Sequence, residues 1–116
     1  AMRVAPGNAG IRERLALLLL RRGETDRARV LLSEAVAESP ADPNVRILLA
    51  ETELKAGRRE DALRELNRAA ALAGSDALLW ARLSKGYHNA GDAAAALQAK
   101  SRAELRSHAA QSKEAK

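Results

Sequence analysis

The sequence contains no cysteine and no phenylalanine, and it has only one tryptophan and one tyrosine. The absence of cysteine excludes disulfide bonds and thiolate metal sites, and it leaves the redox compartment undetermined. So few aromatic side chains would give a single globule of 116 residues a thin core. A stacked array of helices avoids this problem, because each unit buries one face on its neighbours.

Strand and membrane signals are missing as well. The chain has no β-branched runs and no period-two alternation, so no strands are predicted. The longest apolar run, Leu15 to Leu20, is too short to span a bilayer, and Arg21 and Arg22 follow it in place of a cleavage site. We therefore expect a packed helix and no membrane insertion. Alanine, leucine and arginine dominate, which fits an all-helical protein and favours a bacterial source.

Apolar residues recur at helical spacing, and glycine or proline interrupts the pattern at regular places. This predicts helices at about residues 9–22, 24–39, 43–56, 58–72, 76–89 and 92–108. Asp42 and Pro43 form a typical helix start, a capping carboxylate followed by proline in the first turn. Residues 1–8 are expected to be a loose lead-in, with Asn8 as cap of the first helix, and residues 109–116 a frayed tail.

Each predicted helix has one apolar face. The first helix is expected to bury Ile11, Leu15, Leu18 and Leu19, with Leu17 and Leu20 on an adjoining face. The faces of the later helices are expected to be Ala28, Leu31, Leu32, Ala35 and Val36; Val45, Leu48, Leu49 and Leu54; Ala62, Leu66 and Ala69; and Leu79, Trp80, Leu83 and Tyr87.

Gly23, Gly57 and Gly91 lie 34 residues apart, and similar residues recur at fixed distances from them. Ala28, Ala62 and Ala96 each follow a glycine by five residues, and Ala16, Ala50 and Ser84 each precede one by seven. A period of this length is typical of helix-turn-helix arrays. Small side chains at these places let two helices cross closely, and a larger one would overpack the crossing at a cost of about 1–3 kcal/mol.

The three units resemble the tetratricopeptide repeat, with its W-L-G-Y-A-F-A-P pattern. The third unit matches best in its first helix and the first unit in its second helix, through Trp80, Leu83, Ser84, Tyr87 and Gly91, and through Ala28, Leu32, Ala35 and Pro40. The resemblance covers residues 9–108 as repeats at about 9–42, 43–76 and 77–108. It implies an all-α, right-handed α-solenoid of three helix-turn-helix repeats.

Some positions depart from the family pattern. Arg12 and Arg46 replace a bulky residue, and Glu53 replaces an aromatic one. Glu53 follows Arg46 by seven residues, so an ion pair between them along one helix face is a hypothesis. Lys100 replaces an apolar residue in the last helix, which we interpret as an end cap that keeps the array soluble.

No pattern indicates catalysis. His88 and His108 are 20 residues apart with no ligand beside them, and a metal site needs three or four converging ligands. Glu60 and Asp61, and likewise Glu51 and Glu53, form carboxylate pairs on helix surfaces, without a sign of the pocket that acid–base catalysis needs. Ser84 fits a close-packing position. We therefore predict a non-enzyme without metal or cofactor.

Nucleic-acid binding is not expected either. The net charge is +5, and most of the excess lies at residues 77–116. The basic doublets Arg21-Arg22 and Arg58-Arg59 lie at helix joints beside acidic residues, so we interpret them as solvated turns. A nucleic-acid site would favour a continuous basic stripe with aromatic side chains for stacking.

The resemblance implies an interaction scaffold that binds a peptide or protein partner in a concave groove lined by the first helix of each repeat. Lys85, His88 and Asn89 lie away from the core face of their helix and are the first candidates for contact. The family's groove positions fall on Glu13, Leu17, Arg21, Asn44, Ile47, Glu51, Lys55, Ala81, Lys85, His88 and Asn89.

Two other hypotheses stay open. One is a non-catalytic segment of a larger bacterial envelope protein, such as a metalloprotease or a pilus or secretion assembly factor, so cytoplasm and periplasm both remain candidates. The other is a self-assembling homo-oligomer that exposes Leu17 and Leu20. Some family members grip a chaperone's C-terminal carboxylate with a clamp of Lys, Asn and Arg. Its positions here hold Glu13, Leu17, Leu48, Leu78 and Arg82, so we predict that such a peptide does not bind in that mode.

Overall fold

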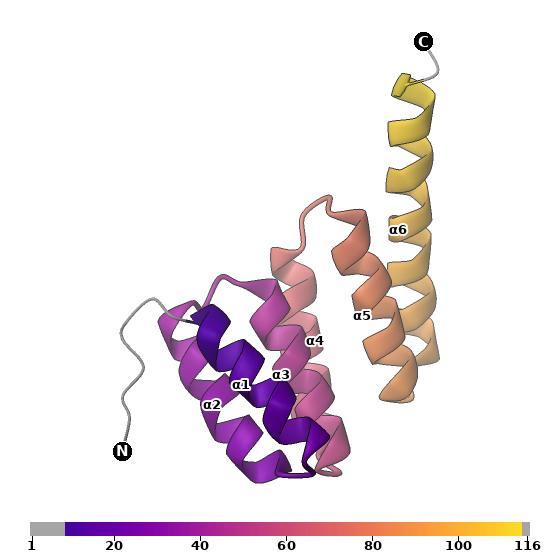
Figure 1. Cartoon of the computed structure of the whole chain (residues 1–116). Coiled ribbons are helices and arrows are strands. Elements are labelled where there is room, and N and C mark those ends of the chain that lie inside the picture. Colours follow the sequence, from indigo (N-terminus) through magenta and orange to yellow (C-terminus); the bar gives the residue numbers. More distant parts are fainter. Residues whose placement is uncertain (1–8, 115–116) are drawn as a thin grey trace.

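The computed structural model describes the backbone of residues 9–114 and the side chains of residues 10–105 (Figure 1). This part is all helical and contains no strand. The lead-in of residues 1–8, with the expected cap Asn8, lies outside it. The helices are α1 (Ala9–Arg21), α2 (Thr25–Glu38), α3 (Pro43–Lys55), α4 (Arg59–Leu72), α5 (Ala77–Asn89) and α6 (Ala93–Glu114).

The bounds agree with the sequence prediction to about one residue, except at the end of α6. The prediction that this helix ends near residue 108 is wrong, because α6 continues to Glu114, whereas fraying of the tail stays a prediction. Residues 107–114 lack an apolar stripe but contain no proline or glycine. Alanine, glutamine, lysine and glutamate favour a helix without packing, and nothing in this segment breaks it.

The helix joints follow from local chemistry. Gly23, Gly57 and Gly91 have φ values of 77°, 77° and 82°, in the left-handed region that glycine adopts after a helix end. Asp42 caps α3 as expected, since its Oδ1 accepts a hydrogen bond of 2.9 Å from the Asn44 N–H. Asp76 caps α5 in the same way. These turns reverse the chain and place consecutive helices side by side.

The helices pack as three pairs, α1 with α2, α3 with α4, and α5 with α6, and the pairs stack through α2 with α3 and α4 with α5. The first helices also touch one another, α1 with α3 and α3 with α5. Among the described residues no such contact joins α2 with α4 or α4 with α6. The array therefore curves, with α1, α3 and α5 on the inner side and the second helices on the outer side.

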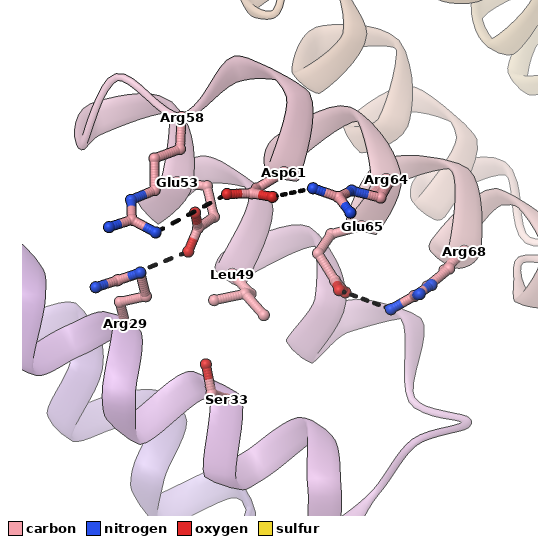
Figure 2. Close-up of a pocket in the computed structure, with 9 residues that line it drawn as sticks. All are labelled: Arg29, Ser33, Leu49, Glu53, Arg58, Asp61, Arg64, Glu65 and Arg68. Carbon is pink, nitrogen blue, oxygen red and sulfur yellow. Dashed lines mark hydrogen bonds and ion pairs between the residues drawn. The ribbon is translucent and has the colours of Figure 1, made fainter.

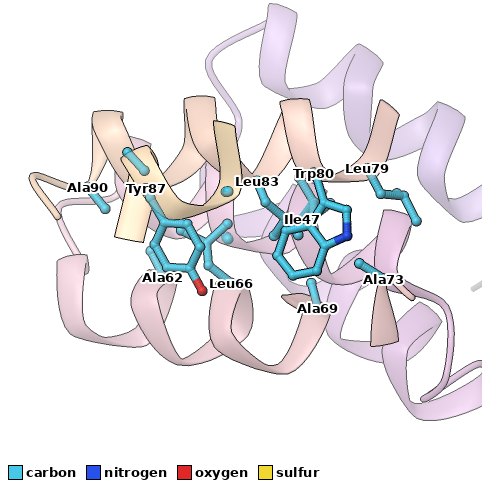
Figure 3. Packing of buried hydrophobic residues seen from close by; sticks show 13 residues of the cluster. Ile47, Ala62, Leu66, Ala69, Ala73, Leu79, Trp80, Leu83, Tyr87 and Ala90 are labelled. Carbon is cyan, nitrogen blue, oxygen red and sulfur yellow. The ribbon is translucent and has the colours of Figure 1, made fainter. Parts of the chain in front are cut away.

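Two hydrophobic clusters hold the pairs together. The first joins α1, α2 and α3 through Ala16, Ala28, Leu32, Ala35, Val45, Leu48 and Leu49. The second, shown in Figure 3, centres on Leu66, Trp80, Leu83 and Tyr87 between α4 and α5. Of the six small residues predicted at close crossings, Ala16, Ala50, Ala28, Ala62 and Ala96 are buried and Ser84 is half-buried.

The predicted inner face of α1 is wrong in three of its four residues. Ile11, Leu15 and Leu18 are 54%, 41% and 48% exposed, whereas Arg12 and Ala16 are buried. The buried pair faces α2, and within the described part of the chain no helix lies on the other side of α1. Leu49 and Leu83, the counterparts of Leu15 in the next two repeats, are buried because the preceding second helix covers them.

Candidate partner-binding face

The inner side of the array presents one row of side chains from each first helix. We call this surface the first-helix face and define it by the residues of α1, α3 and α5 that are exposed or half-exposed there. All of the predicted groove residues except Ile47 are exposed or half-exposed, and their place on this face stays a prediction. They are Glu13, Leu17, Arg21, Asn44, Glu51, Lys55, Ala81, Lys85, His88 and Asn89.

Ile47 does not belong to the first-helix face, and its prediction as a groove residue is wrong. Its side chain is 0% exposed and lies in the second hydrophobic cluster (Figure 3). The reason is that α3 is the middle helix of the inner row, so α1 and α5 approach it from both sides. The corresponding residues of the outer repeats, Glu13 and Ala81, have a neighbour on one side only and stay accessible.

A hydrogen bond connects two repeats on this face. Arg82 of α5 donates through Nη1 to Asn44 Oδ1 of α3 over 2.6 Å. Glu13 of α1 lies near them: burial raises its pKa, Asp42 raises it further, and the Arg82 charge lowers it. The three repeats thus meet in one polar cluster. The groove prediction omitted Arg82, although it precedes Lys85 by three residues and so shares its side of the helix.

The C-terminal ends of the first helices make one edge of the face basic. Arg21 and Lys55 occupy the same position in repeats one and two, and Lys85 and His88 lie on the last turns of α5. Cations at helix C-termini are also favoured by the helix dipole, so part of their effect is structural. The side chains of Arg21, Lys55 and Lys85 are exposed, however, and their charges remain available to acidic groups of a partner.

The outer side has a different character. A groove of about 260 Å³ lies between α2, α3 and α4 (Figure 2), and we call it the ion-pair groove. Its acidic groups are matched by arginines: Asp61 contacts Arg58 and Arg64, and Glu65 contacts Arg68 at 3.3 Å. Its lining residues are Arg29, Ser33, Leu49, Glu53, Arg58, Asp61, Arg64, Glu65 and Arg68.

Glu53 is the buried acid of the ion-pair groove. Its carboxylate lies 3.9 Å from Arg29 Nε, not beside Arg46, so the predicted pair with Arg46 is wrong. Arg46 Nη1 instead lies 3.0 Å from Glu65 Oε2. Burial raises the pKa of Glu53, and Arg29 partly opposes this shift. The sequence places Arg46 and Glu53 on one helix, but the stacking of α3 against two different second helices separates their partners.

The residues weighed for catalysis have structural surroundings. Ser84 Oγ donates a hydrogen bond of 2.9 Å to the Ala96 carbonyl and so joins α5 to α6. His88 is exposed, and the His108 side chain lies outside the described residues. Within the described part of the chain, no three His, Cys, Asp or Glu side chains are grouped as a metal site would require. No helix there is long and apolar enough to cross a membrane.

These features define a helical-repeat scaffold with an open inner face. The chain belongs to the tetratricopeptide-repeat family, whose model matches residues 19–86. The repeats of this family form protein-interaction scaffolds and are generally non-catalytic. No curated protein sequence matches the chain significantly.

Solved structures share the fold at low sequence identity. A mutant of MamA is 24% identical with a TM-score of 0.64, over 88% of this chain and 74% of that one. MamA MSR-1 is 23% identical with a TM-score of 0.65, over 91% and 61%. The second TPR of Spaghetti (RPAP3), bound to the HSP90 peptide SRMEEVD, is 21% identical with a TM-score of 0.69, over 86% and 93%. At these identities the likeness supports the fold alone.

Proposed function

We propose that the first-helix face binds a peptide segment or a surface of a partner protein. The observation that carries this proposal is the direct contact of α1 with α3 and of α3 with α5, while the second helices stay apart. This arrangement brings polar side chains of all three repeats onto one inner surface. Repeat proteins use extended concave surfaces of this kind for binding.

The chemistry of the face favours a partner with acidic side chains. Arg21, Lys55 and Lys85 are exposed at its basic edge, and Asn89 adds an amide that can both donate and accept. Glu13 and Glu51 contribute carboxylates on the same side, so a peptide with both charge signs fits better than a uniformly acidic one. An extended peptide would also receive hydrogen bonds to its backbone from these side chains.

A capture experiment tests the proposal. The protein is immobilised, partners are captured from a lysate of the producing organism, and the affinity of the purified partner is then measured by calorimetry. Lys85→Glu reverses an exposed charge of the basic edge on α5, and we expect it to weaken binding by about tenfold or more. Lys100→Glu makes the same change on an exposed position of α6 and serves as the control.

The control is expected to bind within about twofold of the wild type. If the partner binds both variants with wild-type affinity, or loses affinity only for the Lys100→Glu variant, its binding surface is not the first-helix face. Circular dichroism and thermal unfolding of both variants check that the fold is unchanged.

A further inference from the structure

The outer end of the first repeat carries an apolar surface that the first-helix face does not include. A hollow of about 510 Å³ opens between α1 and α2. Ile11 and Leu18 project beside it and are 54% and 48% exposed. We call this surface the end face; its hollow is lined by Leu15, Leu19, Asp26, Arg27, Val30 and Leu31.

The hollow occupies the same place in repeat one as the ion-pair groove in repeat two. A shift of 34 residues takes Leu19, Val30 and Leu31 to Glu53, Arg64 and Glu65. In repeat two these positions carry charges that are paired within the groove, Glu53 with Arg29, Arg64 with Asp61 and Glu65 with Arg68. In repeat one all three are aliphatic, and Val30 is 55% exposed. Paired charges are compatible with a groove that stays open to solvent, whereas aliphatic side chains at the same places, with Val30 exposed, suit a covering apolar surface.

The α1 side of the end face shows the same property. Leu15 has as its counterparts Leu49 and Leu83, which are buried under the second helix of the preceding pair. Leu15 therefore occupies an interface position of the array without an internal partner among the described residues. A single covering helix at the usual stacking position would still leave Val30 open, since its counterpart Arg64 is exposed in repeat two. An occupant that covers α1 and α2 together would bury both Leu15 and Val30.

Helix α6 of a second copy, at the opposite end of the array, does not suit the end face. In α6, Lys100 and Glu104 stand where α4 has Leu66 and Ala70. Head-to-tail stacking would press these charges against Leu15 and Leu18, and burying an unpaired charge is costly. The end face itself is a better match, because it combines projecting side chains with a hollow and has Asp26 beside Arg27 at its rim. Under a two-fold axis, projections can enter hollows and opposite charges can face each other.

We propose that the end face binds the end face of a second copy of this chain, which gives a closed two-fold dimer. The two α1–α2 pairs then form the centre of the assembly. The α3 and α5 parts of the first-helix face remain outside the contact in both copies, since these helices do not take part.

Sedimentation equilibrium from about 1 µM to about 1 mM tests the proposal. We expect a reversible monomer–dimer equilibrium for the wild type. Val30→Glu and Leu18→Glu introduce a charge into the contact and should each weaken dimerisation by about tenfold or more, with unchanged helix content. Leu97→Glu makes the same change at a residue of α6 that is 65% exposed, and it should leave the equilibrium as in the wild type.

Cross-linking distinguishes the two-fold contact from other arrangements. Because the chain has no cysteine, Val30→Cys and Leu97→Cys each provide a single thiol. A flexible bifunctional thiol reagent should link two Val30→Cys chains to each other, and should not link Val30→Cys to Leu97→Cys in a mixture. A chain that stays monomeric at about 1 mM overturns the proposal. So does a dimer that Leu97→Glu disrupts while Val30→Glu leaves it intact, which would indicate head-to-tail stacking.

Discussion

Gly86 of α5 lies so close to Leu66 of α4 that a Cβ atom added to the glycine would be 2.7 Å from Leu66 Cδ2. Both residues are buried where the second and third repeats meet. The corresponding position holds Thr52 in repeat two and Leu18 in repeat one, so a larger residue fits the repeat itself. It is the approach of α4 to α5 that selects glycine here.

We expect Gly86→Leu to lower the free energy of unfolding by about 1–3 kcal/mol, because overpacking outweighs the gain in helix propensity of about 1 kcal/mol. Urea denaturation measures the change. In a Leu66→Ala background the added side chain finds room, so the same substitution should cost clearly less there. If Gly86→Leu lowers the free energy of unfolding equally in both backgrounds, Leu66 does not limit the size of the side chain at position 86.

A second prediction concerns the helix crossing at Ala62. Ala62 is fully buried in the second cluster, whereas Ala71 on the same helix is exposed. Ala62→Leu should therefore lower the melting temperature by roughly 4–8 °C per kcal/mol lost, and Ala71→Leu should leave it nearly unchanged. Both variants add the same atoms to α4. If differential scanning calorimetry gives equal shifts, the crossing does not depend on a small residue at this position.

A third prediction follows from the buried acid of the ion-pair groove. Burial raises the pKa of Glu53 above its ordinary value of 4.5, Arg29 opposes this, and Asp61 adds to it. The folded state then holds this proton more tightly than the unfolded chain, so the free energy of unfolding falls as the pH rises above 4.5. Glu53→Gln carries no charge and should lose this contribution. Its stability relative to the wild type should increase from about pH 4 to about pH 7.

Urea denaturation at several pH values provides the test for Glu53. Glu13, whose pKa burial also raises, is present in both proteins and cancels in the difference. Glu60→Gln removes an exposed carboxyl group from α4 and controls for the general change in charge. A stability difference that is independent of pH, or that favours the wild type increasingly as the pH rises, would contradict the burial argument.

A fourth prediction concerns chaperone tails. The clamp positions hold Glu13 and Leu48, and the structure buries Leu48 and engages Arg82 with Asn44. A C-terminal carboxylate needs several free donors that converge on it, and these positions do not supply them. Calorimetry at low salt with the peptide SRMEEVD should therefore show no binding tighter than about 1 mM. Micromolar binding that Arg82→Ala abolishes would mean that the repeats must be aligned differently.

Most of the helical framework could be read from local patterns. Glycines 34 residues apart mark the turns because a left-handed φ value suits glycine, and this need arises within a few residues of chain. The small residues at helix crossings could be predicted for a similar reason, since their spacing from each glycine repeats. The end of α6 is not marked by its apolar face, because residues 107–114 have none and helix propensity alone continues the helix to Glu114.

The candidate site was predictable in part. Helical spacing was enough to separate Lys85, His88 and Asn89 from the core residues of α5. It was not enough for Ile47, because its burial depends on α1 and α5 approaching α3 from both sides. Nor could spacing show that Arg82 reaches Asn44, which is 38 residues away in the sequence.

The sequence by itself determined the all-helical repeat, its turns and its small crossing positions, because these depend on backbone preferences and on a period that is visible along the chain. Only the tertiary structure decided which apolar faces find a partner and which charges meet. Leu15 and Leu49 are the same residue at the same position, yet one is exposed and the other buried. The difference is a helix that packs against α3 and has no equivalent against α1 among the described residues. Whether a side chain is buried depends on the helices that pack against it, and the sequence of one repeat does not specify which helices these are.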